Sequence, residues 1–431
     1  MSGTSIAPWL AASSWPTVPI RLVARLGTGH TPSRSVPEYW NNCTVPWITL
    51  ADVGQLRSGI QTTISETKEK ISLAGLANSS AVKHPAGTVI LSRTASVGFS
   101  AIMGTDMATS QDFATWTCGP KLLPRYLLHA LRGMSPDLKR VATGSTHKTI
   151  YMPDIEQLRV PLPTREEQRR IADFLDGETA RIDALSNARD AQARCLQQLW
   201  HSQLAQVANQ LIKGYGLLPL RRMTNSVEQG WSPQCEEVAA NPDEWAVLKT
   251  SAVSSGLFRA AEHKRLPTHM LPEHRYQVFD GDVLMTRGSG SPAHVGVACV
   301  ARTEGRLLLL SDLLYRVRLH QPSGAEFVTL MLASAPVRGF MSQLFRGQSG
   351  QTIKLRSEDV KSIAIPAVPE SKQVKVAAAL LQKQREIGNA QQALTRSSNL
   401  LAERRQALIT AAVTGQFDVS TASGRNVTEG V

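Results

Sequence analysis

The feature that most constrains the fold is a long helical segment that occurs twice in the chain. The first copy begins at Val160 with VPLPTREEQRRIADFLDGETARIDAL, and the second begins at Ile365 with IPAVPESKQVKVAAALLQKQREIGNA. At an offset of 205 residues, Leu175 aligns with Leu380 and the residues around them match. The chain is therefore interpreted as an internal duplication.

Both copies have the composition of long surface helices. After a loop that contains proline, each runs for more than 40 residues without proline and is rich in Ala, Gln, Arg, Leu and Glu, which favour helix. The second copy repeats an apolar residue every seven positions, at Leu380, Ile387, Leu394, Leu401 and Leu408. This spacing indicates a coiled coil. The first copy has Arg189 and Gln203 in this stripe, and the two helices are expected to pack on each other.

The alternative is that both segments are core helices of one ordinary domain. The spacing along the chain argues against it, because each helix is preceded by a block of roughly 150 residues, which is a usual domain size. The 431 residues are enough for two to four domains, and 42% of them are hydrophobic, enough to form folded cores. We therefore expect two globular blocks, each followed by one long helix.

Charge and cysteine content restrict the class of protein. The net charge is +12, and residues 1–163 carry 15 basic and 9 acidic residues. Such a surplus suits binding to a polyanion, although a solvated basic surface would have the same charge. Five cysteines without a CxxC pair indicate a reducing compartment. Because no signal peptide and no run of 18 apolar residues is found, a cytoplasmic location is expected.

The two blocks share a strand that is followed by an arginine. The segment AGTVILSRTASVG begins at Ala86, and DGDVLMTRGSGSPAHVG begins at Asp280. In both, a turn glycine, a short apolar strand and a hydroxyl residue come before Arg93 or Arg287 and a small polar loop. A structural arginine that pairs with a carboxylate is the alternative. Its recurrence in both copies favours a functional role.

Two further loops also recur. Each block closes with a polar loop, ATGSTHKTIYMPDI from Ala142 and RGQSGQTIKLRSEDV from Arg346. Their amide, hydroxyl and basic groups suit phosphate oxygens and base edges, although a glycine-rich hairpin turn is the alternative. Earlier in each block, GTGHTPS and EQGWSPQ place Gly29 and Gly230 at matching positions.

The search for catalytic motifs finds almost nothing. The chain has no GxxxxGK phosphate loop, no GxSxG elbow, no HExxH motif and no NPPY-type tetrapeptide. One spacing formally resembles a PD…ExK nuclease motif, with Asp243 followed by Glu262 and Lys264. Glu262 lies in a polar stretch that reads as a loop, so we interpret the match as accidental. No catalytic residue and no metal site are predicted.

Several of these segments together resemble a known family. They are PLPTREEQRRIADFLDGETARIDAL, the repeated strands GTVILSRTASVG and GDVLMTRGSGSP, and the ending RRQALITAAVTGQFDV. They look like the DNA specificity subunit of type I restriction-modification enzymes, over about Val18 to Val419. The resemblance implies an α+β fold with an internal pseudo-repeat, in which two target-recognition domains are separated by two long helices packed as an antiparallel coiled coil.

The expected boundaries follow from the repeat. They are residues 1–163 for the first target-recognition domain, 164–213 for the first long helix, 214–369 for the second domain, 370–415 for the second helix, and 416–431 for a tail. A helix of about 40 residues is roughly 60 Å long. Paired helices of this length could hold two readers about one DNA turn, roughly 34 Å, apart.

The resemblance also implies function and partners. It implies a non-catalytic subunit that reads a bipartite, asymmetric sequence in double-stranded DNA. It would scaffold methyltransferase subunits, two of them, and restriction or translocase subunits. DNA adenine methylation and ATP-dependent cleavage would be carried by these partners, together with S-adenosylmethionine, ATP and Mg²⁺, with no cofactor in this chain and no membrane. The alternatives are a coiled-coil DNA-binding regulator and a freestanding metal-dependent nuclease that uses Asp243 and Glu262.

Site residues are predicted in two groups. The DNA-binding candidates are Arg93, Thr94, Ser96, His147 and Lys148 in the first block, and Arg287, Ser289, Gln348, Gln351 and Lys354 in the second. The candidates for contact with partner subunits are Glu166, Glu167, Gln168 and Gln373. Ser371-Lys372 stands where the first helix has Glu166-Glu167. If the two helix starts touch identical partner subunits, the two contacts cannot be chemically equivalent.

Overall fold

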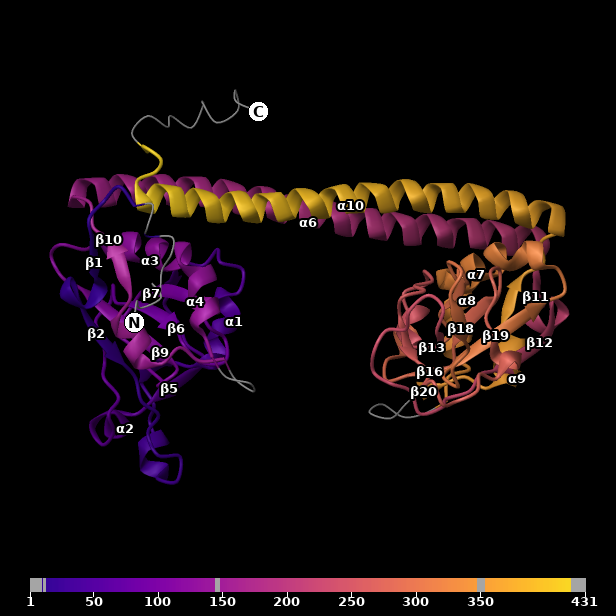
Figure 1. Ribbon diagram of the computed structural model, residues 1–431, viewed down its shortest axis with the longest axis horizontal. Coiled ribbons are helices and arrows are strands. Elements are labelled where there is room, and N and C mark those ends of the chain that lie inside the picture. The colour runs from indigo at the N-terminus through magenta and orange to yellow at the C-terminus, as the bar shows by residue number, and fades with distance from the viewer. Residues whose placement is uncertain (1–9, 11–12, 144–147, 347–352, 420–431) are drawn as a thin grey trace. The chain divides into compact units, whose positions relative to one another are not determined.

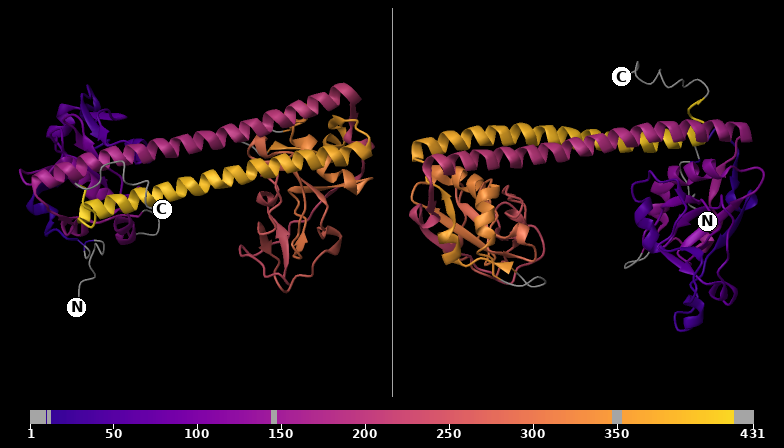
Figure 2. Two further views of the ribbon diagram at one scale, coloured as in Figure 1. Left: turned by 90° about the horizontal axis from the view of Figure 1, so that it is seen from above. Right: turned by 180° about the vertical axis from the view of Figure 1, so that it is seen from behind.

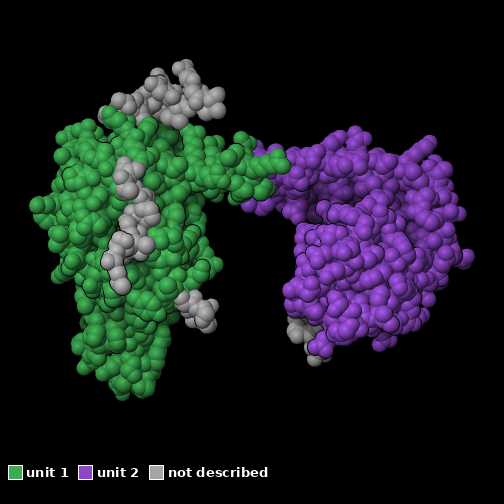
Figure 3. Space-filling view, in the orientation of Figure 1, with its two compact units in different colours: residues 1–190, 395–431 green, residues 191–394 purple. Residues whose placement is uncertain are grey.

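The computed structural model describes residue 10 and residues 13–143, 148–346 and 353–419. The chain divides into two compact units (Figure 3). Unit 1 consists of residues 1–190 and 395–431, and unit 2 consists of residues 191–394. Each unit combines one globular block with parts of both long helices.

The two long helices are α6 (Arg165–Tyr215, 51 residues) and α10 (Glu370–Thr414, 45 residues) (Figure 1). At the start of α6, the hydroxyl of Thr164 accepts a hydrogen bond from the N–H of Glu167 at 3.3 Å. Each helix is followed by a glycine, Gly216 or Gly415, with φ of +72°. This left-handed conformation is accessible to glycine and terminates a helix. The predicted pair of long helices is confirmed.

Within each unit, α6 and α10 run antiparallel and share a hydrophobic core (Figure 2). In unit 1, Leu175 near the start of α6 and Val413 near the end of α10 lie in one buried cluster. In unit 2, Leu204 near the end of α6 and Leu380 near the start of α10 lie in another. The predicted antiparallel packing is therefore present in both units.

The apolar seam is buried unevenly along α10. Leu380 and Ile387 are 7% and 6% exposed, whereas Leu394, Leu401 and Leu408 are only partly buried. Leu380 belongs to the buried cluster of unit 2, whereas Leu408 is partly buried and packs against the cluster of unit 1.

Unit 1 contains two sheets and a strand pair. The larger sheet has the order β2 (Ala24–Thr28), β9 (Phe113–Cys118), β6 (Val89–Ser92), β7 (Ser100–Met103) and β4 (Thr63–Ile64). The smaller has the order β5 (Glu69–Ile71), β3 (Val45–Ile48) and β8 (Ala108–Thr109), and β1 (Thr17–Pro19) pairs with β10 (Arg159–Pro161). The helices of its globular block are α1 (Val53–Leu56), α2 (Leu73–Ala77), α3 (Pro124–Gly133), α4 (Ser135–Val141) and α5 (Met152–Glu156).

Unit 2 repeats this framework. Its larger sheet has the order β12 (Thr224–Gln229), β19 (Leu314–Leu319), β15 (Val283–Thr286) and β17 (Ala298–Val300). The smaller sheet is β14 (His263–Arg265), β13 (Trp245–Leu248) and β18 (Leu307–Leu309), and the strand pairs are β11 (Leu217–Pro219) with β21 (Ala364–Pro366) and β16 (Gly288–Ser289) with β20 (Ile353–Lys354). The helices of its globular block are α7 (Ala325–Ala333), α8 (Ala335–Ser342) and α9 (Ser357–Ser362).

The repeated strand of the sequence forms the middle of both larger sheets, as β6 in unit 1 and β15 in unit 2. Every residue of both strands is buried, which explains their apolar composition. The turn glycines that precede them, Gly87 and Gly281, both have positive φ, at +85° and +88°. The duplicated sequence therefore encodes a duplicated core.

Candidate nucleic-acid interface

In unit 1, the loop after β6 lies against the loop that precedes α5. The carbonyl of Arg93 accepts a hydrogen bond from the N–H of Ile150 at 2.8 Å. The N–H of Ala95 donates to the carbonyl of Lys148, also at 2.8 Å. These two loops therefore bring together four of the predicted DNA-binding residues, Arg93, Thr94, Ser96 and Lys148.

The two basic residues of this pair of loops differ in their surroundings. Lys148 is exposed and Arg93 is half-buried. The Nη1 of Arg93 donates to the carbonyl of Ile150 at 3.4 Å, while its buried Nε has no hydrogen-bond partner among the described residues. A buried donor without a partner costs free energy, so Arg93 would gain from an acceptor brought by a ligand.

The counterpart in unit 2 is a short ladder between β16 and β20. β16 follows Arg287 directly, and in the ladder Gly288 lies opposite Lys354 and Ser289 opposite Ile353. Lys354 is exposed, and Ser289 is partly buried. Three of the predicted residues of unit 2, Arg287, Ser289 and Lys354, therefore lie together, from segments more than 60 residues apart in the sequence.

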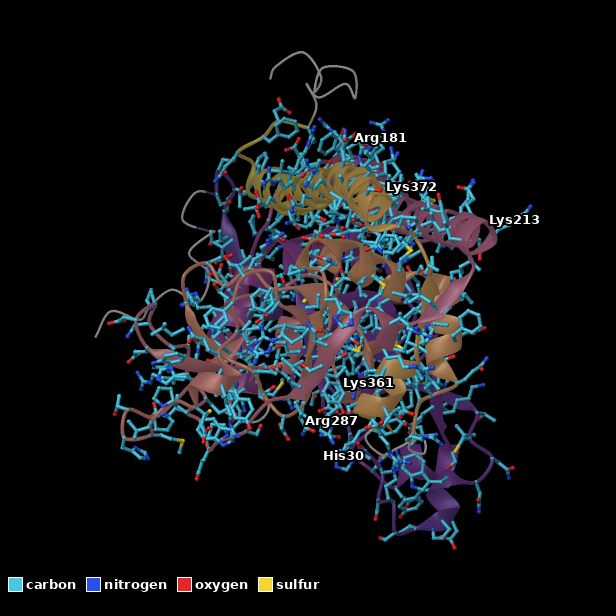
Figure 4. The ribbon with its side chains drawn as sticks, turned by 90° about the vertical axis from the view of Figure 1, so that its right-hand side faces the viewer. His30, Arg181, Lys213, Arg287, Lys361 and Lys372 are labelled. Carbon is cyan, nitrogen blue, oxygen red and sulfur yellow. The ribbon has the colours of Figure 1, made fainter. Side chains whose placement is uncertain are left out.

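The side chain of Arg287 is held by its own unit. Its Nε donates to the hydroxyl of Tyr315 at 3.2 Å, and its Nη1 donates to the carbonyl of Asp312 at 3.4 Å. Figure 4 shows Lys213 on α6 and Lys372 on α10 at one end of unit 2. Arg287 and Lys361 lie at the other end of the unit, away from the long helices. The candidate contacts of unit 2 are thus on the side of the block opposite α6 and α10.

Three predicted DNA-binding residues lie outside the described residues of the structure. They are His147 in unit 1 and Gln348 and Gln351 in unit 2. In the sequence, His147 is adjacent to Lys148, and Gln348 and Gln351 precede Lys354 by six and three positions.

Gly29 and Gly230, which align in the repeat, each precede a polar contact that was not predicted from the sequence. A Cβ on Gly29 would overlap the backbone of Thr109, and one on Gly230 would overlap the backbone of Leu310. After each glycine, a hydroxyl donates a hydrogen bond to a side chain in the loop that precedes β9 or β19. In unit 2, Ser232 donates to Asp312 at 2.5 Å.

The matching contact in unit 1 joins Thr31 to Gln111 at 2.7 Å. The signal that could have found both contacts is the GTGHTPS and EQGWSPQ repeat, because a recurring glycine marks a close backbone approach.

Two of the predicted partner contacts, Gln168 and Gln373, are buried within their units. Gln168 is fully buried, and its side chain donates to the carbonyls of Lys121 and Pro163 at 2.9 and 3.0 Å and accepts from the N–H of Leu123 at 2.9 Å. Gln373 is 6% exposed and donates to the carbonyl of Val368 at 2.7 Å. Each glutamine fastens the first turn of its helix to the adjacent loop, because a buried amide requires internal partners.

The two acidic residues remain accessible at the start of α6. Glu166 is exposed and Glu167 is partly buried. Arg170 pairs with both, at 2.9 Å to Glu166 and 3.6 Å to Glu167. The candidate surface for a partner at this end is therefore a mixed acidic and basic patch.

The nuclease-like pair does not form a metal site. Asp243 is exposed in a loop, and Glu262 accepts a hydrogen bond from Ser251 at 2.6 Å. In the described part of the chain, no group of three or more His, Cys, Asp or Glu residues is placed to hold a metal ion. The nuclease alternative is therefore not favoured.

No helix in the described ranges is both long and apolar enough to span a membrane.

Comparison with known proteins identifies the family of the first half. Residues 12–193 match the family model described as type I restriction modification DNA specificity domain. The chain carries a type I DNA specificity domain. This domain includes the globular block of unit 1 and the first part of α6. The family resemblance is thereby confirmed for residues 12–193.

Two relatives of the specificity domain are themselves named as specificity subunits. The type I restriction enzyme EcoEI specificity subunit of Escherichia coli is 34% identical over 153 residues, which are 35% of this chain and 26% of that protein. The MjaIX specificity subunit of Methanocaldococcus jannaschii is 29% identical over 163 residues, which are 37% of each chain. The match therefore spans less than two fifths of the length of either relative.

A solved structure extends the likeness in fold beyond the specificity domain. It is described as the structural basis underlying complex assembly and conformational transition of the type I R-M system. Its chain matches with a TM-score of 0.71 and 18% identity, over 94% of this chain and 98% of that chain. At this identity the likeness concerns the fold, and the predicted α+β fold with two long helices is confirmed.

Proposed function

We propose that this chain is the non-catalytic DNA-recognition subunit of a type I restriction-modification system. One recurring arrangement carries the proposal: in each unit, an arginine that follows a buried strand lies beside an exposed lysine from a second segment of the chain. Arginine can form two hydrogen bonds with a guanine edge, and lysine suits phosphate oxygens. The specificity domain at residues 12–193 supports the same function for unit 1.

We propose further that the target is bipartite and asymmetric, with one half read by each unit. The two loop pairs share their framework but differ in side chains and in the contacts of the arginine. Arg93 has a buried Nε without a partner in the described residues, whereas the Nε of Arg287 is bonded to Tyr315. Sites that differ in this way favour different bases.

In this proposal, residues 1–163 and 214–369 are the target-recognition domains, and α6 and α10 form the spacer between them. The packed length of the two helices would set the number of unread base pairs in the target. Their continuity over 51 and 45 residues supports a stiff spacer.

The proposed partners are two modification methyltransferase subunits and the restriction subunits. Adenine methylation and ATP-dependent cleavage, with S-adenosylmethionine, ATP and Mg²⁺, are assigned to these partners, and the complex is expected to act in the cytoplasm. Because Gln168 and Gln373 are buried, the proposed partner contacts narrow to Glu166, Glu167 and the exposed residues around them.

Methylome sequencing tests the proposal in a host that carries this chain with its methyltransferase. The expected result is one methylated motif with two specified parts and an unspecified gap. The purified chain should bind that duplex with a steep salt dependence and should not turn over S-adenosylmethionine or ATP. Mg²⁺-dependent DNA cleavage that disappears on Glu262→Ala substitution would support the nuclease alternative instead.

A further inference from the structure

An apolar groove lies between the end of α6 and the start of α10 in unit 2. Its volume is about 450 Å³. The residues that line it are Gln203, Gln206, Val207 and Gln210 of α6 and Val376, Ala379, Leu380 and Lys383 of α10. Its surface is formed mainly by aliphatic side chains, with polar groups at the margin.

The internal repeat provides a counterpart of this groove in unit 1. At the offset of 205 residues, Val376 corresponds to Ile171, Ala379 to Phe174 and Lys383 to Glu178. On the other helix, Val207 of α6 corresponds to Ala412 of α10. The burial agrees with this alignment, since Leu380 and its counterpart Leu175 are 7% and 0% exposed.

In unit 1, the chain covers its own groove. After Gly415, whose φ is +72°, the chain turns back, and the N–H groups of Gln416 and Phe417 donate to the carbonyl of Ala411 at 3.0 and 3.3 Å. The ring of Phe417 then lies against that of Phe174, with 5.6 Å between centroids. Phe417 therefore acts as an aromatic anchor in the unit 1 groove.

In unit 2, the chain takes another path. After Tyr215 it passes through Gly216 into β11, which pairs with β21, so no segment equivalent to Gln416–Val419 folds back over the groove. The residues that line the groove also differ, because unit 2 has the exposed Ala379 at the position where unit 1 has Phe174. Within the part of the chain that the structure describes, the unit 2 groove is therefore uncovered, and it is less filled by side chains than its counterpart.

The charge around the unit 2 groove also differs from that in unit 1. Lys372, Lys375 and Lys383 of α10 stand where α6 has Glu167, Arg170 and Glu178. The start of α10 therefore carries three basic side chains where α6 carries two acids and one base. Lys383 pairs with Glu386 at 3.2 Å, but this pair is exposed, and exposed pairs contribute little and exchange readily. Of these three lysines, Lys383 lines the groove, so an acidic side chain of a ligand can pair with it there.

We propose that the unit 2 groove binds a segment of a partner protein that carries an aromatic residue followed by an acidic residue. The segment places its aromatic ring over Ala379, as Phe417 does over Phe174, and its carboxylate toward Lys383. Buried aromatic side chains dominate the affinity of such contacts, and the charge pair selects among aromatic segments. This inference does not require the chain to read DNA.

The test uses a fluorescent peptide with the sequence of residues 411–419, AAVTGQFDV, and the full-length chain without DNA. Fluorescence anisotropy should show saturable binding of one peptide per chain, because the unit 1 groove is occupied by Phe417. A peptide with alanine in place of the phenylalanine should bind at least about tenfold more weakly, the change that corresponds to ~1.4 kcal/mol.

Variants of the chain locate the peptide. Ala379→Glu introduces a carboxylate into the groove and should weaken binding at least about tenfold. Ala378→Glu makes the same change at the adjacent exposed position, which does not line the groove, and should leave binding unchanged. Lys383→Glu should weaken binding of the native peptide more than that of a peptide with asparagine in place of the aspartate.

Three results would overturn the proposal. One is equal binding by the Ala379→Glu and Ala378→Glu chains. Another is peptide binding that is lost only on Phe174→Ala substitution, since this would show exchange of the tail in unit 1. The third is self-association of the chain through this face, measured by sedimentation, that the peptide does not reverse, because the occupant would then be a second copy.

Discussion

The Nε of Arg287 lies 3.2 Å from the hydroxyl oxygen of Tyr315, and that hydroxyl lies 3.0 Å from the carbonyl oxygen of Leu355. The tyrosine thus links the arginine to Leu355, the residue that directly follows β20. In unit 1, the strand register places Ala114 at the position of Tyr315, so Arg93 has no equivalent hydroxyl. The two arginines share a place in the repeat but not a set of contacts.

Replacing Tyr315 by Phe should affect the second half-site selectively. The change leaves the Leu355 carbonyl and the Arg287 Nε without this partner, which should cost about 1 kcal/mol of stability and loosen Arg287. Binding should weaken for the cognate duplex but not for a duplex in which the half-site read by unit 2 is scrambled. Tyr126→Phe is the control, because it removes a buried hydroxyl that donates to Pro161 at 3.0 Å in unit 1. Equal effects of both variants on cognate binding would contradict this role.

Lys148 and Arg93 should respond differently to substitution by alanine. Loss of Lys148 should weaken cognate and scrambled duplexes alike and reduce the salt slope by about one, as expected for a phosphate contact. Loss of Arg93 should reduce the binding free energy for the cognate duplex by about 1 to 3 kcal/mol and should reduce the preference for one base at a single position. Lys139→Ala on α4, also exposed, is the matched control for charge. If neither variant differs from the control on either duplex, these residues do not contact DNA.

A buried ionic network distinguishes unit 2 from unit 1. The side chain of Arg316 is 3% exposed and lies 2.6 Å from Glu228 and 3.5 Å from Asp282. In unit 1, Thr115 stands at the position of Arg316 and Thr88 at that of Asp282, and Thr88 lies 3.1 Å from Thr117. The same place in the repeated sheet is therefore charged in one unit and neutral in the other.

Glu228 should make unit 2 sensitive to acid. Burial raises the pKa of Glu228, but hydrogen bonding and charge from Arg316 outweigh it, so the pKa lies below its ordinary value of 4.5. A lowered carboxyl pKa contributes stability that is present above pH 4.5 and lost as the pH falls through the folded pKa. Hydrogen exchange of β12 and β19 should accelerate less on acidification in Glu228→Gln than in the native chain. Glu326→Gln, which removes an exposed pair with Arg302, should retain the native acid response.

His129 should give unit 1 a separate pH dependence. Its side chain is 1% exposed and its Nε2 lies 2.7 Å from Asp176 on α6. Burial lowers the pKa of His129 and outweighs the opposite effect of Asp176. The unfolded chain therefore takes up a proton first, and stability falls as the pH decreases below 6.5. Unfolding of His129→Gln should depend less on pH in this window. The exposed His201→Gln variant should behave as the native chain, and a similar flattening there would contradict the assignment.

Matched insertions test whether the helices measure the DNA target. Seven residues added after both Ala188 and Ala393 should preserve the heptad seam and lengthen the pair by about 10 Å. Both half-sequences should still be read, with a gap longer by roughly three base pairs. Insertion after Ala188 alone should disrupt the pairing. A folded double insertion that still methylates only the original spacing would show that the helices do not set the gap.

The repeated helices and strands could be predicted because their signals are local. The heptad residues Leu380 and Ile387 and the apolar run of β6 depend on periodicity within one segment. The meeting of Arg93 with Lys148 was less accessible, since it depends on hydrogen bonds between distant loops. Repetition of both loops in the sequence indicated their importance but not their contact.

The role of the helix-start glutamines could not be predicted from local pattern. Gln168 and Gln373 align in the repeat and resemble exposed residues of a polar first turn, yet both are buried. Their partners, such as Lys121 for Gln168, lie in loops whose path only the tertiary fold fixes. Phe417 is a similar case, because its contact with Phe174 joins residues 243 positions apart.

The discontinuity of unit 1 has a consequence for the order in which the chain can fold during synthesis. Its core contains Ile409 and Val413 from the last turns of α10, and the N–H of Ser14 donates to the carbonyl of Thr414 at 2.9 Å. A ribosome makes these residues about 400 positions after Ser14. Unit 2 is a single stretch of sequence and can close as soon as its last helical turns emerge. Although unit 1 is begun first, it is the unit that must be completed last.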